Sequence, residues 1–224
     1  MFDEIKKVLE RLEQHNFEAY VVGGFIRDYL LERETNDVDI CTNASCGELA
    51  NIFPGSKANY LKSGIKFRIG DNVYEISTYR TESNYRKRTP QNINFINDVE
   101  QDLVRRDFTI NALLMDKDLQ IYDYHNSKID LLNGIIRELA DVTEDPLRIL
   151  RAIRFATILD FKIEEELDKK IKENSSLVDE LSNNRIMSEV EMIINSSNWQ
   201  YGYNLLKRYN LIKLINQISD LNFH

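Results

Sequence analysis

The sequence predicts an α+β fold, in which a small mixed or antiparallel sheet with helices comes first and an all-helical part follows. Three short runs of β-forming residues, separated by turn residues and helical patterns, lie at 18–22, 37–40 and 73–79. From about residue 145 onward the apolar spacing is helical. We therefore expect one compact domain and a smaller, helical appendage.

The composition is that of a protein with a substantial core and no general affinity for nucleic acid. The chain has 224 residues, of which 42% are hydrophobic and 29% charged, enough to bury a core. Its formal net charge of -8 argues against nonspecific adhesion to nucleic acid, so any RNA contact must be local. No stretch reaches the apolar length of a membrane span, and residues 1–16 predict an amphipathic helix rather than a targeting peptide. The sequence therefore predicts a cytoplasmic protein with no membrane partner.

A glycine pair between a predicted strand and a predicted helix is a candidate phosphate site. Residues 18–22 predict a short strand and residues 25–31 a helix, with Gly23 and Gly24 forming the tight turn between them. Such a turn directs backbone N–H groups toward an anion, and Arg27 in the first helical turn adds guanidinium donors. The glycine pair could equally be no more than a turn.

Two aspartates on the next predicted strand are a candidate metal site. In an extended segment 37–40, Asp37 and Asp39 share one face while Val38 and Ile40 share the other. Carboxylates this close repel each other unless a cation lies between them, and ligands that offer only oxygen suit Mg²⁺. An ordinary surface strand end that carries two acids is the alternative.

Two hairpins are predicted further along the chain, and they pair residues 66–69 with 73–79 and residues 111–115 with 119–124. Glu75 alternates with apolar residues in its strand, so it could face the two aspartates as a third carboxylate. It could equally face solvent on an edge strand. Residues 80–90 are polar and basic, which predicts a mobile loop.

Residues 144–156 predict a largely buried helix that nevertheless carries arginines. Asp145 suits the N-cap and Pro146 the first helical position. The arginines share roughly one face of the helix and are Arg148, Arg151 and Arg154. Buried guanidinium groups need anionic or hydrogen-bonding partners, which could be neighbouring acids or a nucleotide. Beyond Lys162 the pattern stays helical to the end of the sequence.

Together these stretches resemble the signature of the class II tRNA nucleotidyltransferase (CCA-adding enzyme) and bacterial poly(A) polymerase family, within the DNA polymerase beta-like superfamily. The matching segments are VVGGFIRDYLL at 21–31, DVDI at 37–40, YRTESNYRKRTP at 79–90, RRDFTINA at 105–112 and EDPLRILRAIRFA at 144–156. Residues 123–127, DYHNS, depart from the glycine-containing sequence that the family usually has there. The resemblance covers nearly the whole chain, as the head, the neck and the beginning of a body.

The resemblance implies a nucleotidyltransferase head over residues 1–138 and a helical neck with the start of a body over residues 139–224. It implies an enzyme that adds C, A or both from CTP and ATP to the 3′ end of tRNA, without a template and with release of diphosphate. Asp37 and Asp39 would bind two Mg²⁺ ions, with Glu75 as a candidate third catalytic carboxylate.

The resemblance also implies nucleotide-binding roles for residues in both domains. Phosphates would be held by Gly23, Gly24 and Arg27, the sugar by Arg106 and Asp107, and further phosphate or base contacts by Arg151 and Arg154. Asp107 could accept from a 2′-hydroxyl, which would favour ribonucleotides. An Asp145 acceptor beside an Arg148 donor would fit the amino group and ring nitrogen of cytosine and adenine but not uracil or guanine.

Several alternatives stay open at this point. The same fold could carry CC-only, A-only or poly(A) synthesis, or a transferase that modifies tRNA ends to inhibit translation. A noncatalytic RNA-binding module is a different class, against which the intact acidic and arginine motifs count. Family members usually continue through further helices that hold tRNA, so a chain of this length predicts a homo-oligomer or a partner subunit in their place.

Overall fold

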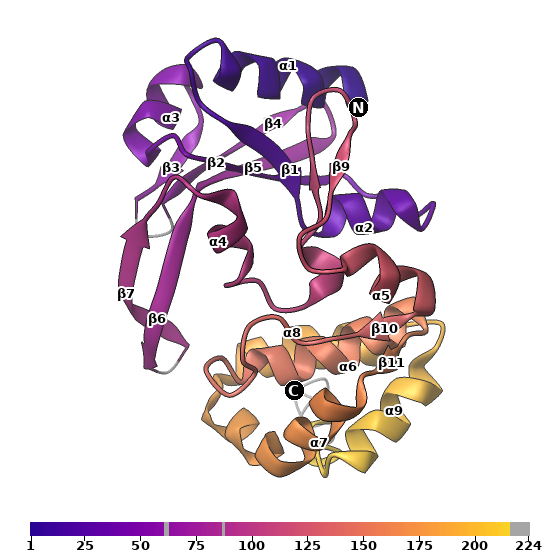
Figure 1. The fold of residues 1–224 in the computed structure, drawn as a ribbon. Helices are drawn as coiled ribbons and strands as arrows, with labels where there is room; N and C mark the ends of the chain where they lie inside the picture. Colours follow the sequence, from indigo (N-terminus) through magenta and orange to yellow (C-terminus); the bar gives the residue numbers. More distant parts are fainter. Residues whose placement is uncertain (61–62, 87, 216–224) are drawn as a thin grey trace, which may run out of the picture. The chain divides into compact units, whose positions relative to one another are not determined.

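The computed structural model describes residues 1–60, 63–86 and 88–215, and it confirms the predicted α+β class (Figure 1). The described residues form two compact units. The first contains residues 1–82 and 93–128, and the second contains residues 83–92 and 129–224 as far as these are described.

The first unit is built on a seven-stranded mixed sheet with the order β3-β4-β5-β2-β1-β8-β9. Its strands are β1 Ala19–Val22, β2 Asp37–Thr42, β3 Lys57–Asn59, β4 Gly64–Ile69, β5 Asn72–Thr78, β8 Leu114–Met115 and β9 Ile121–Tyr122. Strands β2 and β5 are parallel, and the other strand pairs described in this sheet are antiparallel. The predicted strands at 18–22, 37–40, 66–69 and 73–79 are confirmed, with ends that shift by one or two residues.

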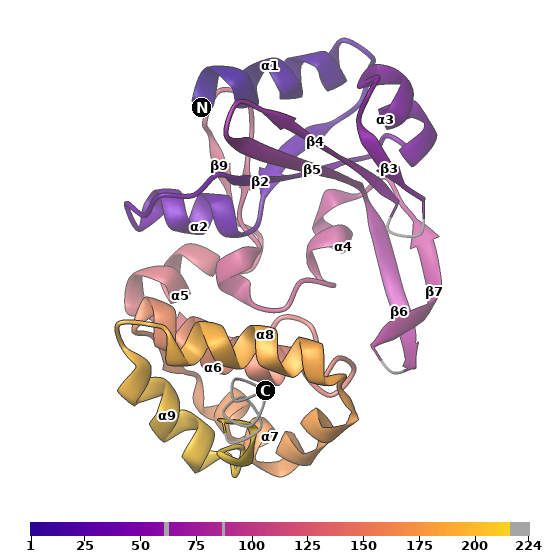
Figure 2. The same cartoon turned by 180° about the vertical axis from the view of Figure 1, so that it is seen from behind.

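Helices cover both faces of this sheet, with α1 and α3 on one side and α2 and α4 on the other (Figures 1 and 2). Their bounds are α1 Phe2–Glu13, α2 Gly24–Leu30, α3 Cys46–Ile52 and α4 Val99–Leu103, with a 3₁₀ turn η1 at Thr109–Asn111. On the α1 side, the ring of Phe67 stacks between Phe53 and Tyr74, at centroid distances of 5.1 and 5.3 Å. This face of the sheet is therefore largely apolar, and the acidic side chains of β2 and β5 lie on the other face.

The predicted loop at 80–90 is wrong, because β6 Arg80–Arg86 and β7 Thr89–Phe95 form a two-stranded sheet. Most residues of this hairpin are exposed or half-buried, so its sequence lacks the apolar alternation by which a half-buried strand is recognised. Residue 87, inside the expected loop, lies outside the described residues.

The second predicted hairpin is present as β8 and β9 but is shorter than expected. Its first strand does not begin at Asn111, because Thr109–Asn111 forms η1. The turn is held by the Asp116 carboxylate, whose Oδ1 accepts from the backbone N–H groups of Asp118 and Gln120, each at 2.9 Å.

The second unit is mainly helical, as predicted. Its elements are α5 Ser127–Asn133, which begins in the first unit, β10 Ile135–Ile136, α6 Leu147–Leu159, β11 Lys162–Ile163, α7 Glu165–Asn174, η2 Ser175–Glu180, α8 Asn183–Ile194 and α9 Trp199–Arg208. The expectation of helix from Lys162 onward is wrong at its start, where β11 pairs with β10 in parallel. For residues 216–224 that expectation lies outside the described part of the chain.

Helix α6 is the core of the second unit and packs against α8 and α9. Gly202 of α9 makes this close packing possible, since a Cβ there would lie 2.6 Å from the Thr157 Oγ1 atom and closer still to Ile193. In the part of the chain that the structure describes, no helix is long and apolar enough to cross a membrane.

We predict that Asp168→Ala destabilises the second unit by about 1–3 kcal/mol, because it leaves the buried Tyr209 hydroxyl without its acceptor. Asp168 accepts from the Tyr209 hydroxyl at 2.7 Å and from Arg208 at 2.6 Å. Burial alone would raise the pKa of Asp168, but these hydrogen bonds and Lys172 lower it. The stabilisation is therefore present above the ordinary aspartate pKa of about 3.9 and is lost as pH falls through the folded value.

Thermal denaturation between pH 3 and pH 8 measures this effect, with Asp179→Ala as the control. Asp179 pairs with Lys213, and both side chains are about half exposed, so its loss should change stability little. An Asp168→Ala variant as stable as the control at pH 7 would contradict the prediction.

Candidate active site

Acidic side chains gather on the polar face of the central sheet. In the parallel pair of β2 and β5, Asp39 lies directly opposite Glu75 and Asp37 opposite Val73. On the next strand, Lys66 lies opposite Glu75, with its Nζ 3.4 Å from Oε2. Because alternate residues of a strand share a face, the carboxylates of Asp37, Asp39 and Glu75 project from the same side of the sheet. This side is called the acidic face below.

The charges on this face are not balanced by the protein. The pKa of Asp39 is raised mainly by burial and further by the carboxylates of Glu75 and Asp37. The positive charges of Arg106 and Lys66 act in the other direction and lower this pKa in part. Asp37 and Asp39 nevertheless keep solvent-exposed surface, so the partly desolvated acids remain reachable from outside. An incoming cation would relieve this repulsion.

The donor set fits Mg²⁺ held by two carboxylates. Within the described residues, no three His, Cys, Asp or Glu side chains already stand in an arrangement that could hold a metal ion. Mg²⁺ in nucleotide sites uses one or two carboxylates and completes its shell with water and phosphate oxygens. Asp37 and Asp39 provide such a pair, and Glu75 lies beside it.

Gly23 forms the wall of this site at the turn between β1 and α2. Its φ of +82° lies in the region that favours glycine. A Cβ at Gly23 would lie 3.4 Å from the Asp39 Oδ2 atom and 3.5 Å from the Arg106 Nη1 atom. Because Gly23 has no side chain, Asp39 and Arg106 both lie close to its backbone.

Arg27, expected at a phosphate, is held by protein groups. Its Nε and Nη2 atoms donate to the Asp28 carboxylate at 3.0 and 2.7 Å. Its Nη1 donates to the Asn111 Oδ1 atom at 2.6 Å, and Asn111 donates in turn to Asp107 at 2.9 Å. A nearly buried chain of polar contacts thus joins the start of α2 to Asp107. Gly24 packs against this chain, since a Cβ at its position would lie 3.3 Å from the Arg27 Nη2 atom.

Asp28 and Asn111 were not predicted as site residues. Asn111 lies four residues after Asp107, the spacing of one helical turn, and this spacing could have indicated that the two side chains are in contact. The Asp107 Oδ1 atom also accepts from the backbone N–H of Phe108 at 2.8 Å. This carboxylate is therefore fixed in place by its own segment.

The predicted base-selecting pair lies in the second unit and contacts the tip of the β6–β7 hairpin. Arg88 donates to both oxygens of Asp145, through Nη2 to Oδ2 at 3.2 Å and through Nε to Oδ1. Arg148 donates to the Asp141 carbonyl oxygen at 2.6 Å, and its guanidinium carbon lies 5.6 Å from the centre of the Tyr85 ring.

The helix α6 begins one residue later than predicted, at Leu147, with Pro146 in the N-cap position. The Asp145 side chain still caps this end of the helix, since it accepts from the Leu147 N–H at 3.0 Å. Of the other two arginines, Arg154 donates to Glu189 at 2.7 Å, and Arg151 lies 5.2 Å from the centre of the Phe155 ring.

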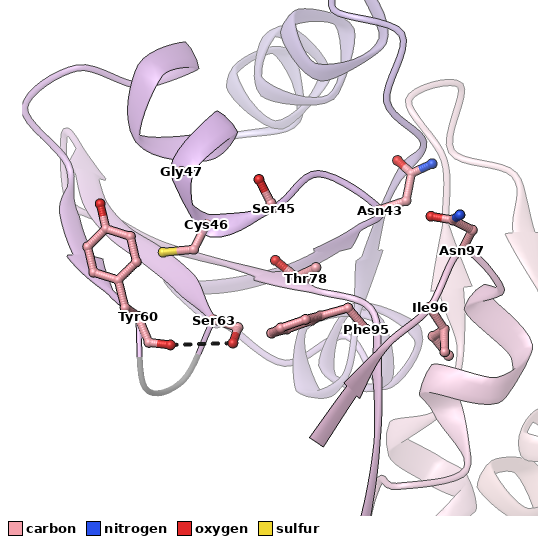
Figure 3. Close-up of a pocket in the computed structure, with 10 residues that line it drawn as sticks. All are labelled: Asn43, Ser45, Cys46, Gly47, Tyr60, Ser63, Thr78, Phe95, Ile96 and Asn97. Atoms are coloured by element: carbon pink, nitrogen blue, oxygen red, sulfur yellow. Dashed lines mark hydrogen bonds between the residues drawn. The ribbon is translucent and has the colours of Figure 1, made fainter. Parts of the chain in front are cut away.

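A separate pocket of about 390 Å³ opens at the far end of β2 (Figure 3). Its lining residues include Asn43, Ser45, Tyr60, Thr78, Phe95 and Asn97, and all ten described lining residues are uncharged. Asp37 begins β2 and Asn43 follows its last residue. The pocket therefore lacks the cations that a triphosphate requires and is distinct from the acidic face.

Comparisons with known families agree with this geometry. Residues 19–137 match the family described as the poly A polymerase head domain, which is more than half of the chain. The chain belongs to the tRNA nucleotidyltransferase and bacterial poly(A) polymerase family. Residues 160–219 match a second family model, described as the probable RNA and SrmB-binding site of polymerase A.

Curated relatives in this family are CCA-adding enzymes. The one from Lactococcus lactis subsp. cremoris is 40% identical over 98% of this chain and 57% of its own length. The one from Staphylococcus haemolyticus is 39% identical over 100% of this chain and 54% of its own length. The chain thus spans little more than half the length of the relatives that it matches.

Solved structures of the family confirm the expected nucleotidyltransferase fold. The Bacillus stearothermophilus CCA-adding enzyme in complex with CTP matches with a TM-score of 0.86 and 31% identity, over 94% of this chain and 52% of that one. The Thermotoga maritima CCA-adding enzyme complexed with tRNA matches with a TM-score of 0.78 and 26% identity, over 95% and 51% of the two chains.

We predict that Gly23→Ala costs about 1 kcal/mol or more of stability and weakens nucleotide binding. The new methyl group would strain a backbone with positive φ and would fill the space at contact distance from Asp39 and Arg106. Thermal denaturation and titration with CTP measure the two effects. Gly47→Ala is the control, because among the described residues no atom beyond its neighbours lies within 4 Å of a Cβ at this helical position. Retention of wild-type stability and CTP affinity by Gly23→Ala would contradict the prediction.

Proposed function

We propose that this chain transfers nucleotides from CTP, ATP or both to the 3′ end of an RNA, most simply tRNA, with release of diphosphate. The observation that carries the proposal is the acidic face, where Asp37, Asp39 and Glu75 gather beside Gly23 and Arg106. Membership of a nucleotidyltransferase family supports it. So do relatives named CCA-adding enzymes and family structures described with CTP, ATP and tRNA.

In this proposal residues 1–138 form the catalytic head, and residues 139–224 form the neck and the start of a body. Asp37 and Asp39 hold Mg²⁺, with Glu75 as a third acid beside them. When bound, the metal neutralises the triphosphate and activates the 3′-hydroxyl as a nucleophile. A cytoplasmic location, and self-association or a partner subunit, stay predictions from the sequence.

The protein groups around the acidic face have defined tasks in the proposed reaction. The backbone at Gly23 and Gly24 leaves room for phosphate oxygens next to Asp39. Arg106 offers its guanidinium to a phosphate or sugar oxygen. Asp107 accepts from the ribose 2′-hydroxyl. Arg27 holds Asp107 in position through Asn111, and its contact with a phosphate stays a prediction.

We propose that Asp145 and Arg148 select the base of the incoming nucleotide. An acceptor beside a donor suits the amino group and ring nitrogen that cytosine and adenine present. Because Arg88 donates to both Asp145 oxygens, a base that binds there must take the place of Arg88. Arg151 and Arg154 would add phosphate or base contacts, and Arg154 would then have to share its guanidinium with Glu189.

An extension assay with Mg²⁺ tests this function on tRNA transcripts that end before CCA, after C and after CC, with each ribonucleotide supplied alone and together. We predict growth that halts at CCA. Growth restricted to C or to A, or growth without limit, would select CC-only, A-only or poly(A) synthesis instead. No growth on any end, together with no Mg²⁺-dependent nucleotide binding, would favour a noncatalytic RNA-binding module.

In the same assay we predict that Asp39→Asn and Asp37→Asn lower the rate by at least about 10³-fold. Loss of a single hydrogen-bond donor to the transition state costs about 10²–10³-fold, and these substitutions remove the charge of a proposed metal ligand. Asp71→Asn is the matched control, because this exposed aspartate lies in the turn between β4 and β5. Near-normal extension by Asp39→Asn would place the metal elsewhere. The extension rate of Glu75→Gln shows whether Glu75 takes part in the reaction as a third acid.

We predict that Asp145→Ala leaves Mg²⁺ binding intact but lowers the preference for C and A over U and G by roughly 10-fold or more, since a bidentate contact is worth about 1–3 kcal/mol. Misincorporation of each ribonucleotide measures the preference. Glu165→Ala, at an exposed acid of the same unit, is the control. An unchanged preference in Asp145→Ala would refute its role in base choice.

A further inference from the structure

Asp102, on α4, is a carboxylate with no exposed surface that does not belong to the acidic face. Its Oδ1 accepts from the backbone N–H of Arg80 at 3.0 Å and from the Arg105 Nε at 2.9 Å. Its Oδ2 has no hydrogen-bond partner among the described residues. A buried carboxylate oxygen left without a hydrogen bond is costly, so its presence needs a reason.

Arg106 supplies that reason. One of its nitrogens, Nη2, lies 3.6 Å from the Asp102 Oδ2 atom, close enough to attract but too far for a hydrogen bond. Its Nε is buried and, within the described part of the chain, also lacks a hydrogen-bond partner. Its Nη1 lies on the other side, toward Gly23 and the Asp39 carboxylate. The guanidinium of Arg106 therefore stands between a buried carboxylate and the acidic face.

The same carboxylate fixes the start of the β6–β7 hairpin. The backbone N–H that Asp102 holds belongs to Arg80, the first residue of β6. Around it, Arg80 and Arg105 both pair with Glu82, at 2.6 and 3.9 Å. One buried acid thus sets the position of two arginines of the 105–112 motif and the base of the hairpin.

We propose that Asp102 is a positioning residue that holds Arg106 beside the acidic face, ready to bind the incoming nucleotide. This role rests on the proposed function for the identity of the ligand. The loose 3.6 Å contact orients the guanidinium, yet its donors can turn to a phosphate or sugar oxygen without first breaking a hydrogen bond to Asp102. Without this anion behind it, Arg106 is drawn toward Asp39 and away from the nucleotide.

The test is the affinity for CTP in the presence of Mg²⁺, measured by calorimetry in four proteins. These are the wild type, Asp102→Asn, Arg106→Gln and the double variant. Asp102→Asn keeps an acceptor for the Arg80 N–H but removes the charge. We expect it to raise the Kd for CTP by about tenfold or more, the size of one charge-assisted contact. In the Arg106→Gln background, the same change should have almost no further effect.

A purely structural role for Asp102 would weaken CTP binding by the same factor in both backgrounds, and that result would overturn the proposal. An unchanged Kd in Asp102→Asn would overturn it as well. Asp98→Asn is the matched control, because Asp98 caps the same helix by accepting from the Glu100 and Gln101 N–H groups. It should leave the Kd unchanged.

If Asp102→Asn fails to fold, Asp102→Glu in the same two backgrounds tests the position of the carboxylate instead of its charge. A Kd for CTP that rises only where Arg106 is present supports the proposal, and an equal rise in both backgrounds overturns it. The binding readout also separates this proposal from the proposed function. A wild type that binds CTP but extends no RNA would contradict the transfer reaction and leave the Asp102 test intact. A wild type that binds no CTP would overturn both.

Discussion

The parallel pairing of β2 with β5 is the constraint on which the site depends. It puts Asp39 opposite Glu75, with Asp37 two residues away on the same face, and it gathers more negative charge than the protein neutralises there. The opposite face of these strands is apolar and is covered by α1 and α3 (Figure 1). The packing that stabilises the sheet therefore also fixes the acids in a position where a cation would relieve their repulsion.

The neighbouring polar groups are arranged in two chains, one of which ends beside this face. One runs from Asp28 through Arg27 and Asn111 to Asp107. The other joins Asp102 to Arg106, which lies beside Asp39. Most of these side chains bind one another, so their task is to set position. Arg106 differs, because its charge acts on Asp39 of the acidic face while its Nε stays without a hydrogen bond among the described residues.

Strand periodicity was sufficient to predict that Asp37 and Asp39 share a face, because that depends on local geometry alone. The position of Glu75 opposite Asp39 could not be predicted in this way, since it requires the register between strands far apart in sequence. The partner of Arg27 was missed for the same reason, because Asn111 is 84 residues away. The β6–β7 hairpin was read as a loop because a ribbon with little buried surface leaves no apolar pattern in the sequence.

The most direct test of the central claim is a crystal structure of the protein with Mn²⁺ and a CTP analogue that cannot be hydrolysed, with the metal located by its anomalous signal. The predicted result is a metal peak at the carboxylates of Asp37 and Asp39, with the triphosphate beside it and Arg106 in contact with the nucleotide. A bound nucleotide whose metal lies away from both aspartates, or a peak at some other group of acids, would contradict the assignment of the active site.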